Sequence, residues 1–580
     1  MACCRRLVGS DAFHVRPEGA AYLTYRCWEG YVPWDIETDL VVVGSGGGAC
    51  CAALVGRSSG KDVLVVEKLA MFGGSTAYSG GIVWVPMNRF LKSADTFEKA
   101  REYLDSVIGD IGRASTPAIR DAYVRQSRNM ICFLETFGIQ FEHARMPDYY
   151  STAPGGLDEG RSILCPLFDL NRLGEWSDRV ARFQGWPPLP LKANEACDLT
   201  LVRRSWAGKL MATKLAWRMF WQKLTGQRLR GMGNALQGQM LKAALDNGVE
   251  IWREAPMTKL VEEGGNVAGI VVRRNGRDVR IRARHGVLLN SGGFSRSDAM
   301  RRRYQPSLGT TAWTAANPGD TGEAIEAAQH VGAAIDLMDA AIWVPASFHP
   351  DGEFGGFHVP NDAGKPHCII VDAQGRRFAN EAQSYNDFGY AMRNCNAVPA
   401  WAIIESRHRD YYSWGIAMPG RTPDSWFSSG YMKVADTLDQ LATQCGIDSA
   451  GLAKTVARFN HFVANGSDTD FRRGERAFDR ANAADPNYAL NPCLGAIERG
   501  PFYAVKIVTA DVGTQGGVIV DEYARVLRDD GSPIGKLYAA GNCTASMTGR
   551  SYPGAGVSIG KSFTFAYIAA RHAFGIAEEG

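Results

Sequence analysis

The sequence contains no run of eighteen apolar residues, no CxxC pair and almost no excess of either charge. Without such an apolar run it offers no membrane-spanning helix. The net charge of +3 is too small to attract nucleic acid through bulk electrostatics, so we expect no nucleic-acid partner. The N-terminus also lacks the apolar core of a signal peptide.

The cysteines are numerous but poorly spaced for a metal site or a disulfide framework. There are 13 of them, an odd number, and they are scattered along the chain. The adjacent pairs Cys3-Cys4 and Cys50-Cys51 are too close together to supply a normal zinc cage. The pattern therefore predicts reduced thiols in a cytoplasmic protein, with no metal.

The composition is that of a large globular protein rather than a disordered one. Hydrophobic residues make up 45% and charged residues 22% of the 580 positions, which is enough for two or three domains. The 65 glycines are well above average usage and gather at turns. Such turns indicate places where the backbone approaches a ligand closely.

A glycine turn between two apolar strands is the clearest functional motif. Residues 39–43 and 63–66 predict strands, and the small residues that follow the turn predict a helix between them. The turn fits GxGxxA, which brings a pyrophosphate close to the backbone and to the helix N-terminus. Glu67 ends the second strand, where an acid binds the adenosine ribose and would repel the extra phosphate of NADP.

Two later glycine-rich segments favour FAD over NAD. Residues 73–81, GGSTAYSGG, are suited to wrapping the pyrophosphate and ribityl chain of a flavin. Ala540-Gly541-Asn542 follows a predicted strand and precedes a helix, whose N-terminus would stabilise negative charge on a reduced flavin ring. Because an NAD site needs neither segment, the sequence predicts FAD.

Several segments, in order, resemble the 3-ketosteroid dehydrogenases of the fumarate-reductase-like flavoproteins. They are GSGGGACCAALVGR, GGSTAYSGGIVWVP, GVLLNSGGF, NPGDTGEAIEAA, GRRFANEAQSY, GTQGGV and LYAAGN with SYPGAGVSIG. The resemblance runs from about Asp39 to Arg571, and SYPGAGVSIG is its most specific part. The chain departs from compact members of the family at residues 1–35 and at about 160–230, which are both longer here.

The resemblance implies an α/β fold: a Rossmann-like FAD-binding domain interrupted by an inserted α+β catalytic domain, with the active site at their interface. We expect an N-terminal extension at 1–35, the first part of the FAD-binding domain at 36–304, the catalytic domain at 305–495 and the second FAD-binding part at 496–580. A basic, aromatic insertion at about 160–230 lies within the first part.

The predicted cofactor residues come from these motifs. The set comprises Gly44, Ser45, Gly46, Gly47, Gly48, Ala49, Glu67, Lys68, Gly73, Gly74, Ser75, Thr76, Ser79, Gly80, Gly81, Gly292, Gly541, Asn542 and Ile559. The first six belong to the dinucleotide turn, and the last four belong to motifs that the resemblance identifies. All of them are predicted to contact or to support bound FAD.

The resemblance also implies the chemistry. Removing two hydrogens beside a ketone requires a polarised carbonyl, a base for the C2 proton and a hydride acceptor for C1, which is the flavin N5. Tyr552 and the backbone N–H of Gly556 would form an oxyanion hole at the C3 oxygen. Tyr385 would take the C2 proton as a tyrosinate, and Tyr123 would supply a hydrogen bond and a proton route to it. Core packing is the alternative for each tyrosine, because the chain has 20.

Three rival functions are weighed against C1–C2 dehydrogenation of a 3-ketosteroid. A 3-ketosteroid Δ4-(5α)-dehydrogenase is not expected to need the tyrosine on the first helix, so Tyr123 with Gly556 favours C1–C2. A fumarate reductase needs cationic groups for its dicarboxylate, whereas Tyr552 falls where its arginine would be. A non-catalytic sterol-binding flavoprotein would not need the tyrosines. The electron acceptor, quinone-like or other, is not identified.

Residues 209–228 combine a basic stripe with a broad apolar one. Basic residues recur every four or five positions, at Lys209, Lys214, Arg218, Lys223 and Arg228. On a helix this pattern is typical of an element that lies on a membrane surface, here the inner face of the membrane. A lid or core helix with snorkelling lysines is the alternative, and the sequence does not decide between them.

Overall fold

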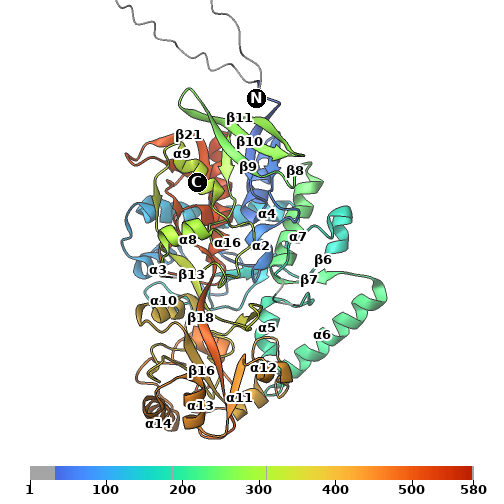
Figure 1. Cartoon of the computed structure of the whole chain (residues 1–580). Coiled ribbons are helices and arrows are strands. Elements are labelled where there is room, and N and C mark those ends of the chain that lie inside the picture. The colour runs from blue at the N-terminus through green and yellow to red at the C-terminus, as the bar shows by residue number, and fades with distance from the viewer. Residues whose placement is uncertain (1–32, 184, 186, 308–309, 578–580) are drawn as a thin grey trace, which may run out of the picture.

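The computed structural model describes residues 33–577, apart from 184, 186, 308 and 309, and contains two main sheets. Nearly all of the predicted N-terminal extension (1–35) lies outside the described residues. Figure 1 places the sheet that contains β1, β10 and β11 at one end of the molecule and the sheet that contains β16 and β18 at the other. The predicted mixture of a Rossmann-like domain and an inserted domain is confirmed.

The first sheet has eight strands in the order β20-β21-β10-β11-β1-β2-β8, with β9 paired to β10. Its strands are β1 (Ile36–Val43), β2 (Val63–Val66), β8 (Glu250–Trp252), β9 (Met257–Glu263), β10 (Asn266–Arg274), β11 (Arg277–Leu289), β20 (Arg525–Leu527) and β21 (Pro533–Ala539). The central strands β21, β11, β1, β2 and β8 run parallel, as their continuous apolar runs require when both faces are covered.

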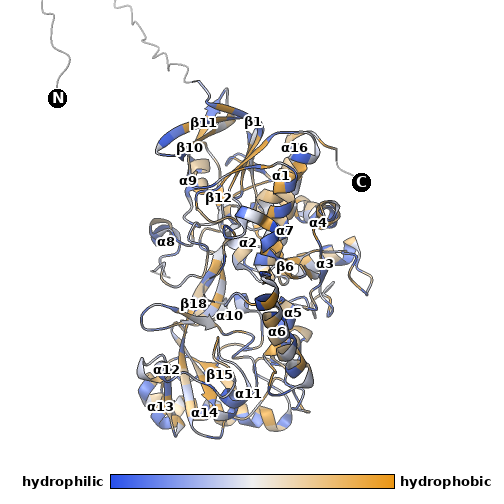
Figure 2. Cartoon of the chain, turned by 90° about the vertical axis from the view of Figure 1, so that its right-hand side faces the viewer, coloured by the Kyte–Doolittle hydropathy of each residue, from blue (hydrophilic) through white to orange (hydrophobic). Residues whose placement is uncertain are grey.

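Alternate residues of the parallel strands enter two separate cores. Leu40 and Val42 face the core formed with α1 (Gly47–Ser58), α7 (Met232–Asp246) and α16 (Val557–Ala573). Val41 and Val43 face the other core, which includes residues of β9, β10 and α9 (Glu323–His330). Figure 2 shows apolar residues along α1 in the interior of this end. The sheet is therefore buried on both faces.

The second sheet has six strands in the order β14-β13-β18-β16-β15, with β17 paired to β18. Its strands are β13 (Ala341–Phe348), β14 (Phe354–Phe357), β15 (Cys368–Val371), β16 (Ala400–Glu405), β17 (Met432–Ala435) and β18 (Phe502–Thr514). All neighbouring strands of this sheet run antiparallel. Helix α10 (Tyr385–Asn394) packs against β13 and β18.

Two of the predicted domain boundaries need correction. The strand pattern near residue 500 was assigned to the second FAD-binding part, but β18 pairs with β13, β16 and β17 at the centre of the catalytic sheet. At the other boundary, α9 lies after residue 305 yet packs in the core of the first sheet. The inserted domain therefore extends from β13 to the end of β18, because strand pairing across long sequence distances decides membership.

The remaining elements surround these sheets. The helices and turns are α2 (Gly74–Tyr78), α3 (Phe97–Ile108), η1 (Gly112–Ser115), α4 (Pro117–Thr136), η2 (Leu170–Trp176), α5 (Ala193–Leu199), α6 (Trp206–Thr225), α8 (Asp298–Tyr304), α11 (Ser406–Tyr411), α12 (Asp424–Ser428), α13 (Leu438–Cys445), α14 (Ser449–Asn465), α15 (Ala477–Ala483) and η3 (Gly541–Cys543). The short strands are β3 (Ile82–Trp84), β4 (Glu142–His143), β5 (Ser162–Leu164), β6 (Phe168–Asp169), β7 (Leu229–Arg230), β12 (Ile335–Asp336) and β19 (Gly517–Val518).

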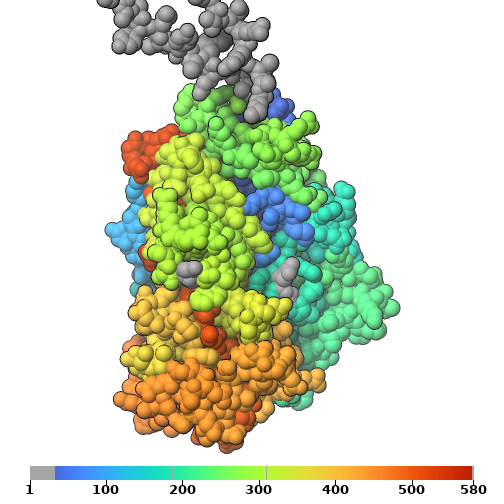
Figure 3. Space-filling model, viewed as in Figure 1, coloured from blue at the N-terminus to red at the C-terminus, as the bar shows by residue number. Residues whose placement is uncertain are grey.

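The basic, aromatic insertion forms a projection on one side of the molecule (Figures 1 and 3). Its main element is α6, which begins after Ser205, whose side chain accepts a hydrogen bond from the Gly208 N–H, and ends at Gly226 in the left-handed conformation. The helix thus spans 206–225 rather than the predicted 209–228. It packs chiefly on α5.

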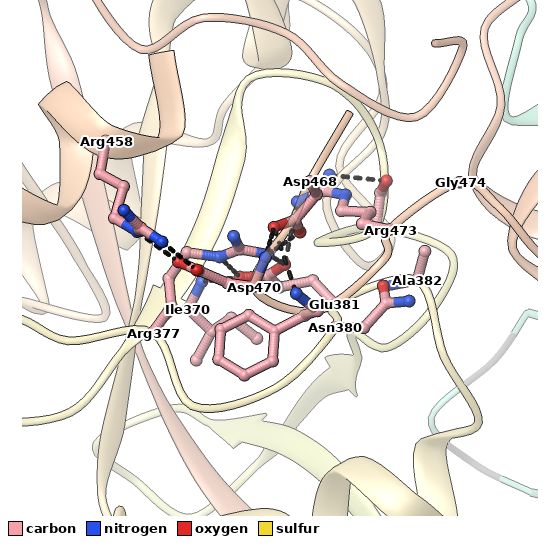
Figure 4. Close-up of polar contacts among 12 residues, drawn as sticks. Ile370, Arg377, Asn380, Glu381, Ala382, Arg458, Asp468, Asp470, Arg473 and Gly474 are labelled. Atoms are coloured by element: carbon pink, nitrogen blue, oxygen red, sulfur yellow. Dashed lines mark hydrogen bonds and ion pairs between the residues drawn. The ribbon is translucent and has the colours of Figure 1, made fainter. Parts of the chain in front are cut away.

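A buried ion-pair network holds the loops of the catalytic domain together (Figure 4). Glu381 accepts from Arg377 at 2.8 and 2.7 Å and from Arg473 at 3.1 Å. The Arg473 side chain also donates to the carbonyls of Gly364 and Lys365, both at 2.7 Å. Glu381 and Arg473 are fully buried, so each charge needs the other to compensate for its loss of hydration.

Replacing Arg473 by alanine is predicted to destabilise the protein strongly. The Glu381 carboxylate would lose one of its two buried cations, which typically costs about 3–5 kcal/mol. Arg458→Ala is the matched control, because Arg458 pairs with Asp470 at a partly exposed position of the same network and should cost less than about 1 kcal/mol. Urea unfolding followed by circular dichroism measures both, and equal losses would contradict the assignment.

Candidate active site

A cavity of about 780 Å³ lies between the two sheets. Residues just after β1, β2, β11 and β21 line one part of it, and residues from the catalytic sheet and α10 line another. The carboxyl ends of parallel strands are where open α/β sheets bind their ligands. The cavity therefore has the expected position for a dinucleotide with a substrate beside it.

Most of the predicted cofactor residues line this cavity. They are Gly44, Ser45, Gly46, Glu67, Lys68, Gly74, Ser75, Thr76, Ser79, Gly80, Gly292, Gly541, Asn542 and Ile559. The other five, Gly47, Gly48, Ala49, Gly73 and Gly81, are not among the lining residues. Gly47 and Gly48 instead face Phe563 and Ser562 of α16, so that α1 can pack closely against that helix.

Glu67 is fixed at the end of β2 by two hydrogen bonds. The Ser45 hydroxyl donates to its Oε2 at 2.6 Å, and the Leu69 N–H donates to its Oε1 at 2.8 Å. Burial raises the pKa of the Glu67 carboxyl, while these donors oppose the rise. The side chain faces the cavity from a defined position, as an acid that binds a ribose must.

The backbone around the first turn fits a dinucleotide. A Cβ built on Gly74 would lie 3.8 Å from the Cα of Gly46, so the two glycine backbones lie close together and both line the cavity without side chains. Helix α1 begins at Gly47 beside them, and its N-terminus carries the positive end of the helix dipole. These residues fit the pyrophosphate of FAD. The walls of the cavity would contact the rest of the cofactor.

Asp320 is a cavity residue that the sequence analysis did not single out. Burial raises the pKa of its carboxyl to about 7, and the Ser75 hydroxyl donates to it at 3.1 Å. It lies in the segment NPGDTGEAIEAA, which was used only to support the family resemblance. An acidic residue between two glycine-rich segments was the sequence signal that could have identified Asp320 as a site residue.

Three tyrosine rings meet in the cavity, at Tyr149, Tyr385 and Tyr552. Their centroids are 5.9 Å apart for Tyr149 and Tyr385, 5.6 Å for Tyr149 and Tyr552, and 5.6 Å for Tyr385 and Tyr552. All three line the cavity. Tyr385 and Tyr552 were predicted site residues, whereas Tyr149, in the segment PDYYSTAPGG, was not.

Tyr123 does not have the position that was predicted for it. Its ring is buried between Trp84 and Phe565, its hydroxyl donates to the Trp84 carbonyl at 2.7 Å, and it is not among the cavity-lining residues. Burial raises its pKa. The rings that contact Tyr385 are those of Tyr149 and Tyr552, and the Tyr123 hydroxyl is used by Trp84, so the predicted hydrogen bond from Tyr123 to Tyr385 is wrong. The family resemblance implied this role for Tyr123, which lies on a predicted helix, whereas Tyr149 lies in a loop.

Hydrogen bonds beside each tyrosine join their segments to the loop that precedes α16. The Tyr149 N–H donates to the Pro553 carbonyl at 2.9 Å. Asn386, the residue after Tyr385, donates from its side chain to the Arg550 carbonyl at 2.8 Å. Tyr552 lies between these two acceptors, so all three rings are held by one loop.

Gly556 provides a backbone donor at the same place. It is the residue before α16 and lines the cavity. Its φ of +89° favours glycine, and a Cβ at this position would lie only 2.2 Å from the Ile82 carbonyl oxygen. Among the described residues none accepts a hydrogen bond from its N–H. The Tyr552 hydroxyl pairs with Ser558 Oγ at 3.0 Å, in the first turn of the same helix. Two donors thus face the cavity near the positive end of α16.

The charge state of Tyr385 is set by its surroundings. Burial raises the pKa of its hydroxyl well above the usual value, and the nearby Tyr149 and Tyr552 hydroxyls add to the rise. Tyr385 is also the first residue of α10, where the positive end of a helix dipole favours an anion. The resting side chain is therefore a neutral phenol.

Known proteins resemble this chain in both sequence and fold. The family profile described as FAD binding domain matches residues 39–559. A 3-oxosteroid 1-dehydrogenase from Mycolicibacterium smegmatis is 38% identical over 92% of this chain and 96% of its own length. The crystal structure of 3-ketosteroid delta1-dehydrogenase from Sterolibacterium denitrificans in complex with 1,4-androstadiene-3,17-dione has a TM-score of 0.87 and 36% identity, covering 93% of this chain and 99% of its own.

A more distant structure shares the fold alone. The 3-ketosteroid-delta4-(5alpha)-dehydrogenase from Rhodococcus jostii RHA1 has a TM-score of 0.63 and 22% identity, over 96% of this chain and 99% of its own. The much higher identity to delta1-dehydrogenases decides between the two branches. FAD is therefore the cofactor, and the chain belongs to the 3-oxosteroid 1-dehydrogenase family of FAD-dependent oxidoreductases.

Proposed function

We propose that the protein introduces the C1–C2 double bond into 3-ketosteroids. The observation that carries this proposal is the convergence of Tyr149, Tyr385 and Tyr552 with the Gly556 N–H at one end of the cavity. These groups are neutral donors and a weak acid, which suit a ketone rather than a carboxylate substrate. A hydroxyl pair is suited to moving a proton within a buried site.

In this mechanism the Tyr552 hydroxyl and the Gly556 N–H donate to the C3 carbonyl oxygen and stabilise the negative charge that develops there. That polarisation acidifies the C2 proton, which Tyr385 accepts as its phenolate. Tyr149, in ring contact with Tyr385, passes the phenolic proton away before turnover. We assign to Tyr149 the role that the sequence analysis gave to Tyr123, and with it the preference for C1–C2 over C4–C5.

Bound FAD supplies the hydride acceptor for C1. The chain contributes an apolar channel for the carbon skeleton, lined by Ile342, Val344, Phe357, Phe478 and Val512. Excluding water from this channel strengthens the hydrogen bonds to the C3 oxygen. It also protects the developing charge from being neutralised by solvent.

A fumarate-reductase activity has little support. Arg550 is the cation nearest to Tyr552 in the sequence, but its side chain pairs with Asp339 at a half-exposed position and does not line the cavity. A dicarboxylate would meet tyrosines and apolar groups instead of a cationic clamp. The same tyrosines argue against a purely sterol-binding flavoprotein.

We also propose that α6 attaches the protein to a membrane surface. Trp206, Leu210, Trp217, Met219, Phe220, Trp221 and Leu224 are all exposed on it, which contradicts the alternative of a core helix. Its buried residues Met211 and Leu215 pack on Leu191, a cavity-lining residue. A steroid, or an electron acceptor of the quinone class, dissolved in the bilayer would thus be close to the cavity.

The predicted basic stripe is only partly available for such a surface. Arg218 donates to Glu195 at 2.6 and 2.8 Å, and Lys214 joins the same carboxylate at 3.1 Å. Arg228 lies beyond the helix and pairs with Asp178 at 2.7 Å. Three of the five basic residues therefore have partners within the chain, so apolar burial would dominate attachment. No helix among the described residues is long and apolar enough to cross a membrane.

Tyrosine-to-phenylalanine variants test the mechanism. Tyr552→Phe should lower kcat by about 10²–10³, as removal of an oxyanion donor does, and Tyr385→Phe by about 10²–10⁴, as loss of a positioned base does. Tyr149→Phe should be more damaging than Tyr123→Phe, its control, because only Tyr149 contacts Tyr385. Stopped-flow reduction of the flavin by a 3-ketosteroid measures the rates, with FAD content confirmed by absorbance. Equal effects of the last two variants would refute the role of Tyr149.

The rate should rise with pH throughout the neutral and mildly alkaline range. Because burial raises the pKa of Tyr385 well above its usual value, its phenolate fraction grows about tenfold per pH unit up to pH 10 and beyond. We expect kcat/KM to follow this slope without a plateau below about pH 10. FAD retention at each pH is the control, and a plateau near neutrality would show that another group is the base.

Vesicle binding should depend on the aromatic face of α6. The protein is expected to co-sediment with phosphatidylcholine–phosphatidylglycerol vesicles, to lose only part of that binding in 1 M salt, where the Debye length is about 3 Å, and to be released by detergent. Phe220→Ser with Trp221→Ser should abolish binding and retain FAD. Leu490→Ser, which changes an exposed leucine elsewhere, is the control. A double variant that still sediments would disprove attachment through α6.

A further inference from the structure

A chain of hydrogen bonds in the catalytic domain ends at the cavity wall. Tyr431 and Ser347 share a hydrogen bond of 2.7 Å, Ser347 Oγ is 2.6 Å from His358 Nε2, and His358 Nδ1 is 2.8 Å from Asp362 Oδ2. The His358 ring is stacked on Trp414, with centroids 4.1 Å apart. The chain thus fixes the orientation of the Asp362 carboxylate.

The geometry resembles a Ser-His-Asp triad, but it is unsuited to nucleophilic catalysis. Ser347 and His358 are fully buried, and neither lines the cavity. The Ser347 hydroxyl is enclosed between Tyr431 and the backbone of β14, so no substrate carbonyl can approach it. Only Asp362 reaches the cavity.

The two oxygens of Asp362 have different surroundings. Oδ2 accepts from His358 Nδ1 and from the Gly415 N–H, the latter at 2.8 Å. Because a carboxylate only accepts, the proton of this ring nitrogen must lie on His358. Oδ1 accepts from none of the described residues, although the side chain is only 8% exposed. It is not among the fully enclosed oxygens, so it can accept a hydrogen bond from a group in the cavity.

Asp362 lies near the open end of the cavity. Its partner Gly415 precedes Ile416, and both Ile416 and Met418 line the cavity while being 67% and 49% exposed. Tyr149 and Tyr552, in contrast, are only 4% and 5% exposed. A steroid whose ketone lies against Tyr552 and Gly556 would extend the opposite end of its skeleton toward this opening.

We propose that Asp362 accepts a hydrogen bond from a hydroxyl group on the end of the substrate remote from the ketone. This inference rests on the proposed function and adds a substrate class to it: 3-ketosteroids with a hydroxyl at or near C17. A carbonyl at that position would bring its lone pairs against the carboxylate, and an ether oxygen would do the same. Asp362 is thereby a specificity-determining residue held in place by His358.

The wild-type protein tests this inference with three matched 3-ketosteroids that carry a 17β-hydroxyl, a 17-ketone or a 17β-methoxy group. A hydrogen bond to a charged acceptor is expected to favour the hydroxyl compound by about 10- to 100-fold in kcat/KM, chiefly through KM because the contact is distant from the reacting carbons. Dissociation constants from calorimetry should follow the same order. Equal values for all three compounds would overturn the inference.

Asp362→Asn gives a sharper result. Its amide oxygen would take the place of Oδ2 as acceptor for His358 and Gly415, which leaves the NH₂ group toward the cavity. The preference should then invert in favour of the 17-ketone, with kcat little changed. Asp410→Asn, which removes one exposed carboxylate from the same domain, is the matched control and should leave the preference unaltered. An unchanged preference in Asp362→Asn would also overturn the inference.

The outcomes separate this inference from the proposed function. If no 3-ketosteroid reduces the flavin, the proposed function fails, while the calorimetric affinities still report on Asp362. If all three compounds are oxidised at one rate and bound equally, only the assignment of Asp362 fails. Should Asp362→Asn not fold, the wild-type series by itself decides the matter.

Discussion

The hydrogen bond from the Tyr149 N–H to the Pro553 carbonyl is the contact on which the site depends most directly. With the bond from Asn386 to the Arg550 carbonyl, it fixes two distant segments to the loop that carries Tyr552. The same loop leads into Gly556 and α16, which packs on α1 beside the dinucleotide turn. One stretch of about ten residues therefore sets the distance between the tyrosines and the cofactor-binding edge of the first sheet.

The parts of this arrangement that are local in sequence were predictable. Strand, turn, helix, strand and acid follow one another between residues 39 and 67, so the dinucleotide site could be recognised without the fold. Tyr552 and Gly556 lie in one motif four residues apart. Tyr149, however, lies in a loop with no periodicity, and contacts with residues distant in the sequence, such as Pro553 and Phe478, hold it at the cavity. The domain boundaries failed for the same reason, since β18 joins the catalytic sheet through partners far away in the chain.

Burial serves two opposing purposes at Tyr385. In the proposed mechanism it excludes water from the hydrogen bonds around the ketone, but it also raises the pKa of Tyr385, the proposed base. The α10 dipole favours the phenolate and opposes this rise, whereas the neighbouring tyrosine hydroxyls add to it. Upstream, the ion pairs of Glu381 with Arg377 and Arg473 hold the segment that leads to Tyr385, so the helix start is fixed by charges that do not enter the cavity.

The strand β18 has a mechanical consequence for how ligands enter and leave. It runs through the centre of the catalytic sheet, and its last residues bond to the other domain: Asp511 accepts from Ser295 at 2.6 Å, and Thr514 accepts from the Phe294 N–H at 3.2 Å. Because this continuous strand is bonded to the catalytic sheet along its length and to the other domain at its end, it resists a hinge motion that would separate the two domains. Ligands would then pass between the loops at the opening of the cavity, where Ile416 and Met418 are exposed, rather than through a gap opened between the domains.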